Sequence, residues 1–232
     1  MTGLQGRGAL LVWSGVVPES EADYNMWHSR EHMPERLAVP GFRRGRRGIA
    51  VYEAPPGQKY LMMYEADDAA VFVSAPYLGR LNDPTPWTQR VLSAYVEPSR
   101  TVCSVVASTG RGVGGWLGTL QVSKSDVTGL RRWAQGTWMD DVLARDGLLG
   151  AHALEGDRTL GQQPTAEKAF RESRGDRDRT VDFALLIEGF DRDATQAALD
   201  ELTRHVSDLS GSQPVSTLYF IQHVITSSDV DL

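Results

Sequence analysis

The residues best suited to chemistry lie close together near the start of the chain. Two of the five histidines, His28 and His32, stand there with Tyr24, Trp27 and Glu31. A histidine beside a carboxylate can be held in one tautomer and can act as a general acid or base near neutral pH. The stretch therefore predicts a site that acts on a small molecule, with His28 as the acid/base and Glu31 or Tyr24 as its orienting partner.

Helical spacing favours this interpretation. Tyr24, His28, Glu31 and Glu35 follow one another at four, three and four positions, so a regular helix would place them on one face, with His32 beside it. The alternative is a solvated face, on which the two glutamates pair with arginines one turn away. If His28 is the acid/base, His28→Ala should abolish turnover with little loss of stability.

The same histidines also allow a metal site. Residues 28–32 read His-x-x-Glu-His, the pattern of inverted zinc proteases, in which two histidines one turn apart bind zinc and the glutamate activates water. Such proteases need a further carboxylate ligand downstream, and Pro34 follows only two residues after the motif. We expect no metal and no cofactor, with a divalent ion on His28 and His32 as the alternative.

Side chains on the neighbouring predicted strands could complete a binding site. Strand alternation sends Arg43 and Arg47 to one face and Arg44 and Arg46 to the other, so one pair could bind a substrate carboxylate or phenolate. The alternative is an exposed strand edge that offsets nearby glutamates. Aromatic residues on two strands could form cavity walls or simply fill the core. The residues predicted to contact substrate are His32, Trp27, Arg47, Arg43, Tyr64 and Trp13.

These residues belong to an order of elements that occurs twice. Residues 9–17 form a predicted strand, 21–38 a helix, 42–52 and 60–65 a hairpin, and 101–107 a strand that follows proline-broken helical material. A similar order recurs between residues 116 and 225, with a helix predicted at 126–144. One constant offset places Trp27 on Trp133 and Gly41 on Gly147. The order βαββαβ, repeated, predicts an α+β fold of two tandem ferredoxin-like units.

The two predicted units are residues 9–109, which carry the candidate site, and residues 114–226, which are degenerate. We expect them to pack sheet to sheet as a pseudo-dimeric α+β barrel, because each copy covers the open sheet face of the other. The glycine-rich residues 110–115 are interpreted as a linker and not as a dinucleotide-binding loop, because a strand follows them. Residues 155–180 form a polar insertion, expected to be mobile except for a helical turn docked through Phe170.

Composition excludes several classes of protein. The 232 residues carry a net charge of −6, which argues against a nucleic-acid partner, because phosphate binding requires a basic surface. The single cysteine, Cys103, cannot form an intrachain disulfide, and no apolar run reaches the length of a membrane span. We expect a cytoplasmic protein that binds a small molecule, a pseudo-dimer within one chain that could form a further homodimer. His152 and His223, on apolar strands, are expected to be hydrogen-bonded core residues.

The motif also resembles a known family. Residues 23–47, with the pattern Trp27-His28-x-x-Glu31-His32-x-x-Glu35-Arg36, the exit Val39-Pro40-Gly41-Phe42 and the pair Arg46-Arg47, resemble the EthD-like branch of the dimeric α+β barrel superfamily. The resemblance implies a ligand cavity between sheet and helices. It also implies relatives that include cofactor-independent oxygenases, lactone isomerases, polyketide-tailoring enzymes and haem-binding proteins.

This resemblance narrows the expected function. In the second half Ala134 aligns with His28 and Trp138 with His32, so any chemistry of this type is confined to the first half. We expect a cofactor-independent lyase, isomerase or oxygenase that acts on an aromatic or polyketide-like substrate. The alternative is a non-catalytic carrier of a small molecule or haem.

Overall fold

A closed barrel of eight antiparallel strands forms the centre of the computed structural model, which describes residues 3–123, 126–175 and 179–230. The order around the barrel is β1-β3-β2-β8-β5-β7-β6-β4. The two halves of the chain therefore join at β2 with β8 and at β4 with β6. The strands are β1 (Gly8–Val16), β2 (Phe42–Ala50), β3 (Tyr60–Ala66), β4 (Tyr95–Gly110), β5 (Trp116–Val122), β6 (Leu148–Gly156), β7 (Phe183–Gly189) and β8 (Val215–Thr226). The predicted α+β barrel is confirmed.

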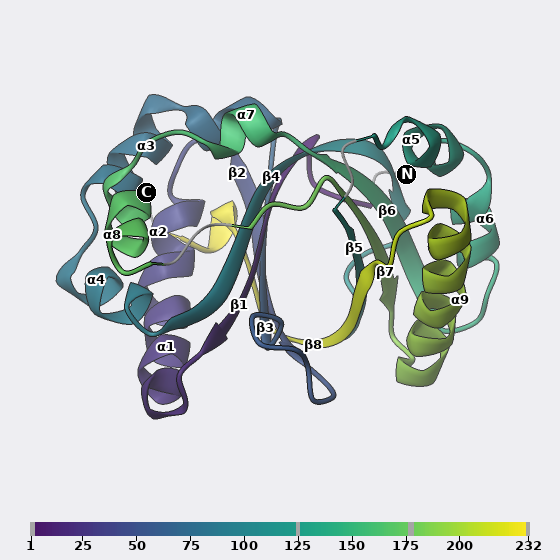
Figure 1. The fold of residues 1–232 in the computed structure, drawn as a ribbon, viewed down its shortest axis with the longest axis horizontal. Coiled ribbons are helices and arrows are strands. Elements are labelled where there is room, and N and C mark those ends of the chain that lie inside the picture. Colours follow the sequence, from purple (N-terminus) through teal and green to yellow (C-terminus); the bar gives the residue numbers. More distant parts are fainter. Residues whose placement is uncertain (1–2, 124–125, 176–178, 231–232) are drawn as a thin grey trace.

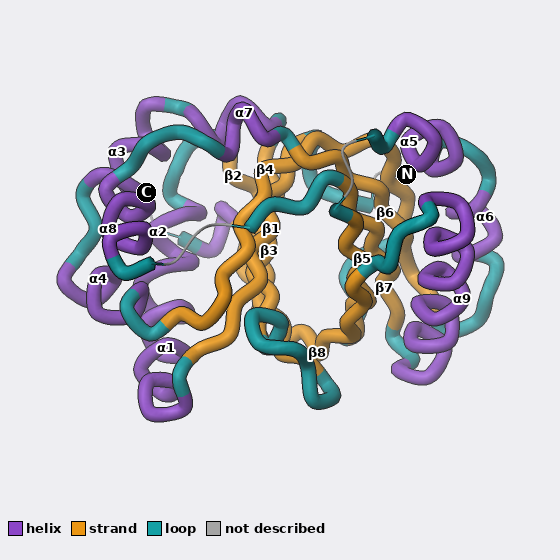
Figure 2. Tube along the Cα trace, viewed as in Figure 1, coloured by secondary structure: helices purple, strands orange, loops and turns teal. Residues whose placement is uncertain are grey.

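The helices lie outside the barrel in two groups, one beside each half (Figures 1 and 2). The first group is α1 (Glu21–Trp27), a π-helical turn (His28–His32), α2 (Met33–Leu37), α3 (Ala75–Asn82), α4 (Pro86–Leu92) and α8 (Ala166–Ser173). The second is α5 (Thr128–Ala134), α6 (Trp138–Leu143) and α9 (Arg192–Ser210), while the short α7 (Arg158–Gly161) lies against β4. The helix predicted at 126–144 is thus two helices, separated at Gly136, a poor helix former.

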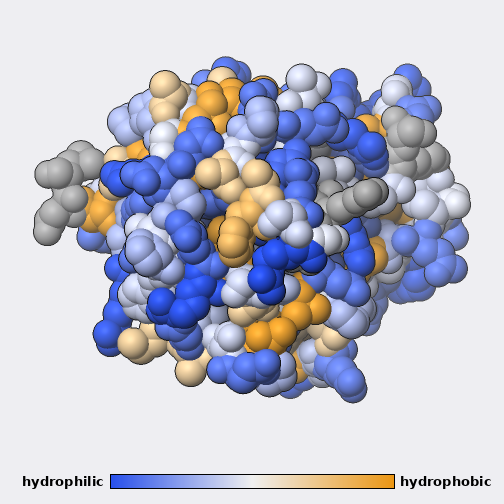
Figure 3. Space-filling model, turned by 60° about the vertical axis from the view of Figure 1, so that its left-hand side comes forward, coloured by the Kyte–Doolittle hydropathy of each residue, from blue (hydrophilic) through white to orange (hydrophobic). Residues whose placement is uncertain are grey.

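Apolar side chains from both halves fill the barrel interior. This cluster joins Leu11 and Trp13 of β1 with Leu117 of β5 and Leu186 of β7. Two further clusters lie between the sheet and the first group of helices, and another lies beneath the second group. On the face that carries the first group, hydrophobic side chains gather only in small groups among hydrophilic ones (Figure 3). No helix of the described ranges is long and apolar enough to cross a membrane.

Strand β2 contributes two buried arginines to the barrel interior. Arg46 contacts Glu188 of β7 at 2.7 Å and Glu65 of β3 at 3.0 Å, and Arg44 binds the Glu65 carboxylate through two nitrogens. The ring of His152 completes the network at 3.0 Å from the Glu188 carboxylate, as expected of a hydrogen-bonded core histidine. Because every one of these charges has a partner, a strand rich in arginine can be buried.

The other two arginines of β2 leave the barrel in different directions. Arg43 is exposed and pairs with Asp67, because the strand register shifts between Phe42 and Arg44. Arg47 points outward under the π-helical turn, where it donates hydrogen bonds to the Asn25 carbonyl and the Ser29 hydroxyl, both at 3.1 Å. The alternative of an exposed strand edge is therefore wrong for three of the four arginines.

The insertion between β6 and β7 docks differently from the prediction. Its helix α8 buries Glu167 and Arg171, whereas Phe170 is only half-buried. A helix dominated by polar residues can still dock when buried charges find partners. The predicted mobility remains a prediction, and part of this segment, residues 176–178, lies outside the described residues.

Candidate functional site

The first helix contains a π-helical turn at His28–His32. This turn changes which side chains of α2 face the sheet. Pro34 is the physical cause we infer, because proline lacks the N–H that would bond to the carbonyl four residues earlier and its ring crowds that carbonyl. One extra residue in a turn advances the inward-facing positions by one. Beyond His28, the positions that face the sheet are therefore those of His32 and Arg36 instead of Glu31 and Glu35.

Gly45 allows α2 to lie directly on the sheet. A Cβ atom at this position would come within 2.9 Å of a Leu37 methyl carbon and 3.1 Å of the Met33 terminal methyl. A second glycine, Gly41, has φ of +95° in the turn between α2 and β2, and Gly147 has φ of +86° at the corresponding place before β6. Left-handed backbone of this kind favours glycine.

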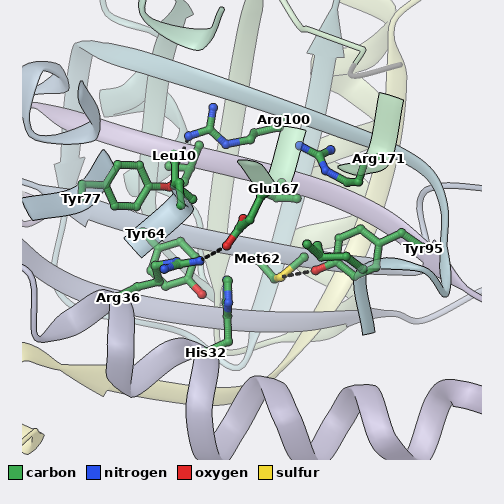
Figure 4. Close-up of a pocket in the computed structure, with 13 residues that line it drawn as sticks. Leu10, His32, Arg36, Met62, Tyr64, Tyr77, Tyr95, Arg100, Glu167 and Arg171 are labelled. Carbon is green, nitrogen blue, oxygen red and sulfur yellow. Dashed lines mark hydrogen bonds and ion pairs between the residues drawn. The ribbon is translucent and has the colours of Figure 1, made fainter. Parts of the chain in front are cut away.

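A cavity of about 50 Å³ lies between the first group of helices and the sheet (Figure 4). Eight elements contribute to its wall. In Figure 4 His32 points into it from the helix below, while Glu167 reaches down from α8. Its lining residues are Leu10, Val12, His32, Arg36, Met62, Tyr64, Tyr77, Leu81, Leu92, Tyr95, Arg100, Glu167 and Arg171. Phenols, aliphatic groups and charges together line it, as they line many small-molecule sites. Its volume is well below the roughly 300–1,000 Å³ of such sites, so an aromatic ligand requires the cavity to widen.

His32 is a neutral titratable group on the wall of this cavity. Burial, followed by the positive charge of Arg36 and the neighbouring His28, lowers the pKa of His32 well below its usual value. Its Nδ1 atom is buried without a hydrogen-bond partner, and its ring lies 4.3 Å from the ring of Trp27. A neutral imidazole can accept a proton through its unprotonated nitrogen, and the lowered pKa makes His32 a weaker base than an exposed histidine.

His28 lies behind the cavity wall and is not one of the residues that line the cavity. It is fully buried, and burial together with nearby Arg47 lowers the pKa of His28 well below its usual value. Its Nε2 atom is 3.4 Å from the hydroxyl of Tyr64, whose ring lines the cavity. His28 therefore reaches the cavity only through Tyr64. Burial raises the pKa of Tyr64 well above its usual value, so its hydroxyl stays protonated.

Charged groups close the cavity opposite His32. The Arg36 guanidinium, 2% exposed, meets the Glu167 carboxylate at 2.7 Å. Arg100 donates a hydrogen bond to the Tyr77 hydroxyl at 3.2 Å. The ion pair joins α2 to α8 across 131 sequence positions and is visible as the dashed line in Figure 4.

Several residues predicted for the site lie elsewhere. Glu31 accepts hydrogen bonds from Thr85 at 2.6 Å and Thr88 at 3.3 Å, so it fastens the helix to α4. Arg43 is in solvent on Asp67. Trp13 faces the barrel interior because odd-numbered residues of β1 point inward, and it does not line this cavity.

Other predicted residues pack against the two histidines or against the helix that carries them. Tyr24 is fully buried, with its ring 5.9 Å from that of His28. Trp27 donates its indole N–H to Thr88 at 3.1 Å, and its ring packs against His32 at a tilt of 36°. Arg47 holds the helix onto β2. His223 was expected in the core, yet it is only half-buried, with Nδ1 lacking a partner, because it lies on the outer face of β8 near Arg47.

Sequence reasoning missed the residues that charge the cavity. Arg36 was part of the quoted motif, and Pro34 was the available signal that the helical face would shift toward it. Glu167 and Arg171 are spaced i and i+4 on a predicted helical turn, which places them on one face. The sequence does not show, however, that this helical turn packs beside Arg36, which lies 131 positions from Glu167.

No group of three or more His, Cys, Asp or Glu side chains within the described ranges is arranged to hold a metal ion. The rings of His28 and His32 are 5.5 Å apart, centroid to centroid, and the Nε2 atom of His28 faces Tyr64. This geometry offers no third protein ligand to a divalent ion.

Solved structures of similar fold match the chain over nearly its whole length. An anthrone oxidase-like protein has a TM-score of 0.59 and 11% identity, with 98% of this chain and 96% of that chain covered. A candidate monooxygenase from Lactobacillus acidophilus has a TM-score of 0.58 and 7% identity, with 96% and 97% covered. Another from Fusobacterium nucleatum has a TM-score of 0.56 and 9% identity, with 96% of both chains covered. The chain has the dimeric α+β barrel fold.

The matches establish the fold alone, because the identities are only 7 to 11%. Neither a family model nor a curated protein matches the chain. The EthD-like resemblance therefore stays a prediction.

Proposed function

We propose that the chain binds a small aromatic, polyketide-like molecule in the first-half cavity and oxidises it with molecular oxygen, without a resident cofactor. The supporting observation is His32, a neutral histidine on the cavity wall whose buried Nδ1 has no partner. The similarity of fold to an anthrone oxidase-like protein suggests the reaction class. In this proposal residues 9–109, the EthD-like half, carry the proton transfer. Residues 114–226 complete the barrel and contribute Glu167 and Arg171 to the cavity wall.

The reaction we assign balances without a further reductant. His32 removes a proton from an activated CH₂ group between two phenolic rings, which leaves a resonance-stabilised carbanion. That anion transfers one electron to O₂, and the resulting carbon radical and superoxide combine and take up the first proton to form a C–O–OH group. Loss of the second C–H proton with cleavage of the O–O bond then gives the carbonyl group and hydroxide, which takes up that proton and leaves as water. Tyr64, a neutral phenol backed by His28, can donate a hydrogen bond to an oxygen that gains charge during the reaction.

The test is oxygen consumption with 1,8-dihydroxyanthrone, followed together with the absorbance of the anthraquinone product. His32→Asn should lower kcat by about 100-fold or more, the usual contribution of a general base. The matched control is His205→Asn, a change at an exposed histidine of α9. Equal turnover by wild type and His32→Asn would refute the assignment of the base.

A second change separates His28 from His32. His28→Ala should destabilise the fold by roughly 2–4 kcal/mol, because it empties a fully buried position among Tyr24, Trp27 and Tyr64. This expectation differs from the one drawn from sequence, in which stability was nearly unchanged. Urea denaturation of both variants measures it, and a His28→Ala protein as stable as wild type would contradict the buried position.

A further inference from the structure

A second set of hydrogen-bonded reactive groups lies at one end of the barrel interior, apart from the first-half cavity. The Oγ atom of Ser108 on β4 is 2.9 Å from Nδ1 of His152 on β6. Nε2 of the same ring is 3.0 Å from the carboxylate of Glu188 on β7. His152 and Glu188 are each only 1% exposed. Serine, histidine and carboxylate linked in this order are the parts of an acyl-transfer triad.

The hydrogen bonds of this triad have one consistent assignment. Burial would raise the pKa of Glu188, but Arg46 and His152 outweigh it and hold this pKa at about 2, so the carboxylate can only accept. In the neutral ring of His152, Nε2 therefore carries the hydrogen, and Nδ1 is left to accept the Ser108 hydroxyl proton. The two ring nitrogens exchange places relative to chymotrypsin-like triads, but the ring passes a proton through either of them.

A peptide group of the chain itself covers the triad. The Leu4 N–H donates to Ser108 Oγ at 3.1 Å. The carbonyl oxygen of the same peptide group, that of Gly3, accepts from the Arg44 guanidinium at 3.4 Å. The Leu4 side chain is 3% exposed and packs into the apolar cluster of the barrel interior. The cover is therefore anchored by one apolar side chain and by two hydrogen bonds that a substrate could replace.

The peptide group between Gly3 and Leu4 occupies the place of a substrate without being one. Its carbonyl oxygen lies on a buried guanidinium, the kind of donor that stabilises an oxyanion. A peptide group is planar, so a hydroxyl that accepts its N–H lies in that plane and not over the face of the carbonyl carbon. Ser108 therefore cannot attack this group, whereas an ester, which has no N–H, can present its carbonyl carbon to Oγ.

The position of Gly3 also limits the size of an acyl group. A Cβ atom there would lie 2.5 Å from Cε1 of His152 and 2.7 Å from the carbonyl oxygen of Thr109. Both distances are shorter than van der Waals contact. An acyl group whose carbonyl takes the place of the Gly3 carbonyl must therefore be unbranched beside that carbonyl.

We propose that Ser108, His152 and Glu188 form a second active site, which hydrolyses esters of small unbranched carboxylic acids. The site opens when residues 3–5 leave the barrel end, and its activity is independent of the oxidation proposed above. The Ser108 oxygen bonds to the ester carbonyl carbon and its proton passes to His152. The C–O bond to the leaving group breaks, and the leaving oxygen takes up that proton. Water then attacks the acyl-serine and gives one proton to His152, and the departing Ser108 oxygen takes it up as the carboxylic acid is released.

The experiment incubates the full chain with p-nitrophenyl acetate, follows nitrophenolate release and locates the acetyl group by peptide mass mapping. The matched comparison is Ser104, an exposed serine four positions earlier on the same strand. Ser108 should be acetylated about 10-fold faster than Ser104, because a general base usually contributes about 100-fold and the closed cover offsets part of this gain. Ser108→Ala should abolish the catalysed release of nitrophenolate, and Ser104→Ala should keep it.

A change in the cover tests its opening without altering the triad. Leu4→Ser removes the apolar anchor, so the open fraction should rise and Ser108 should be acetylated about 10-fold faster than in wild type. The branched ester p-nitrophenyl 2-methylpropanoate should acylate Ser108 much more slowly than the acetate, after each rate is divided by that of the same ester with imidazole. Circular dichroism checks that each variant is folded.

Any of three results would overturn the inference: acetylation of Ser108 no faster than that of Ser104, equal acetylation of wild type and folded Leu4→Ser, or equal corrected rates for the two esters. The comparison of the two serines and that of the two esters use the wild-type chain, so they decide the question even if Leu4→Ser does not fold.

Discussion

Replacing Arg46 with methionine should lower the free energy of unfolding by about 3–5 kcal/mol, because removal of one partner leaves buried carboxylates uncompensated. Arg46 is 1% exposed and binds both Glu188 of β7 and Glu65 of β3. Burial alone would raise the pKa of Glu188, but Arg46 and His152 outweigh it and hold this pKa at about 2. Thermal denaturation should show a midpoint roughly 10 °C lower.

Arg43→Met provides the control on the same strand. Arg43 pairs with Asp67 in solvent, and exposed pairs of this kind contribute little to stability. Its midpoint should stay close to that of the wild type. If the two methionine variants melt together, the Arg46 network does not hold the halves of the barrel as described.

Acid should destabilise the protein below pH 6.5 through His28 and His32. Burial lowers the pKa of both well below the usual value, so in this range the unfolded chain binds protons that the native protein does not. Stability therefore falls as pH falls, by about 1.4 kcal/mol per pH unit for each histidine, until the native pKa is reached. At pH values between the unfolded and native pKa values, the two histidines together should lower the free energy of unfolding by up to about 2.7 kcal/mol per pH unit.

Urea denaturation at a series of pH values measures this slope. His32→Asn should reduce it by the contribution of one histidine, whereas His205→Asn should keep the wild-type dependence. An unchanged slope in His32→Asn would mean that His32 is protonated in the native protein, and it would also remove the proposed base.

The barrel could be predicted because its signals are local and repeated. Strand-forming runs, the order βαββαβ and the glycines at 41 and 147 each follow from a few neighbouring residues. The face of the first helix could not be predicted by the same means. Periodicity assumed 3.6 residues per turn, whereas the π-helical turn before Pro34 replaced Glu31 and Glu35 with His32 and Arg36.

Ion pairs between residues far apart in the sequence could not be predicted either. Nothing near Arg46 in the sequence indicates Glu188, and nothing near Arg36 indicates Glu167, because the fold alone brings these charges together. A polar insertion was accordingly expected to be mobile, although its two buried charges give it a specific place over the cavity.

Closure of the barrel at β2 with β8 and at β4 with β6 occurs within one polypeptide. Two half-length chains that built the same barrel would separate on dilution and, by symmetry, would carry two identical sites. In this protein the β2–β8 and β4–β6 pairings form within one chain, at an effective concentration set by the covalent linkage. Barrel closure therefore does not depend on the protein concentration. A substitution in one half is also not copied into the other. Each half can therefore acquire or lose reactive side chains independently, and the stoichiometry we expect is one ligand per 232-residue chain.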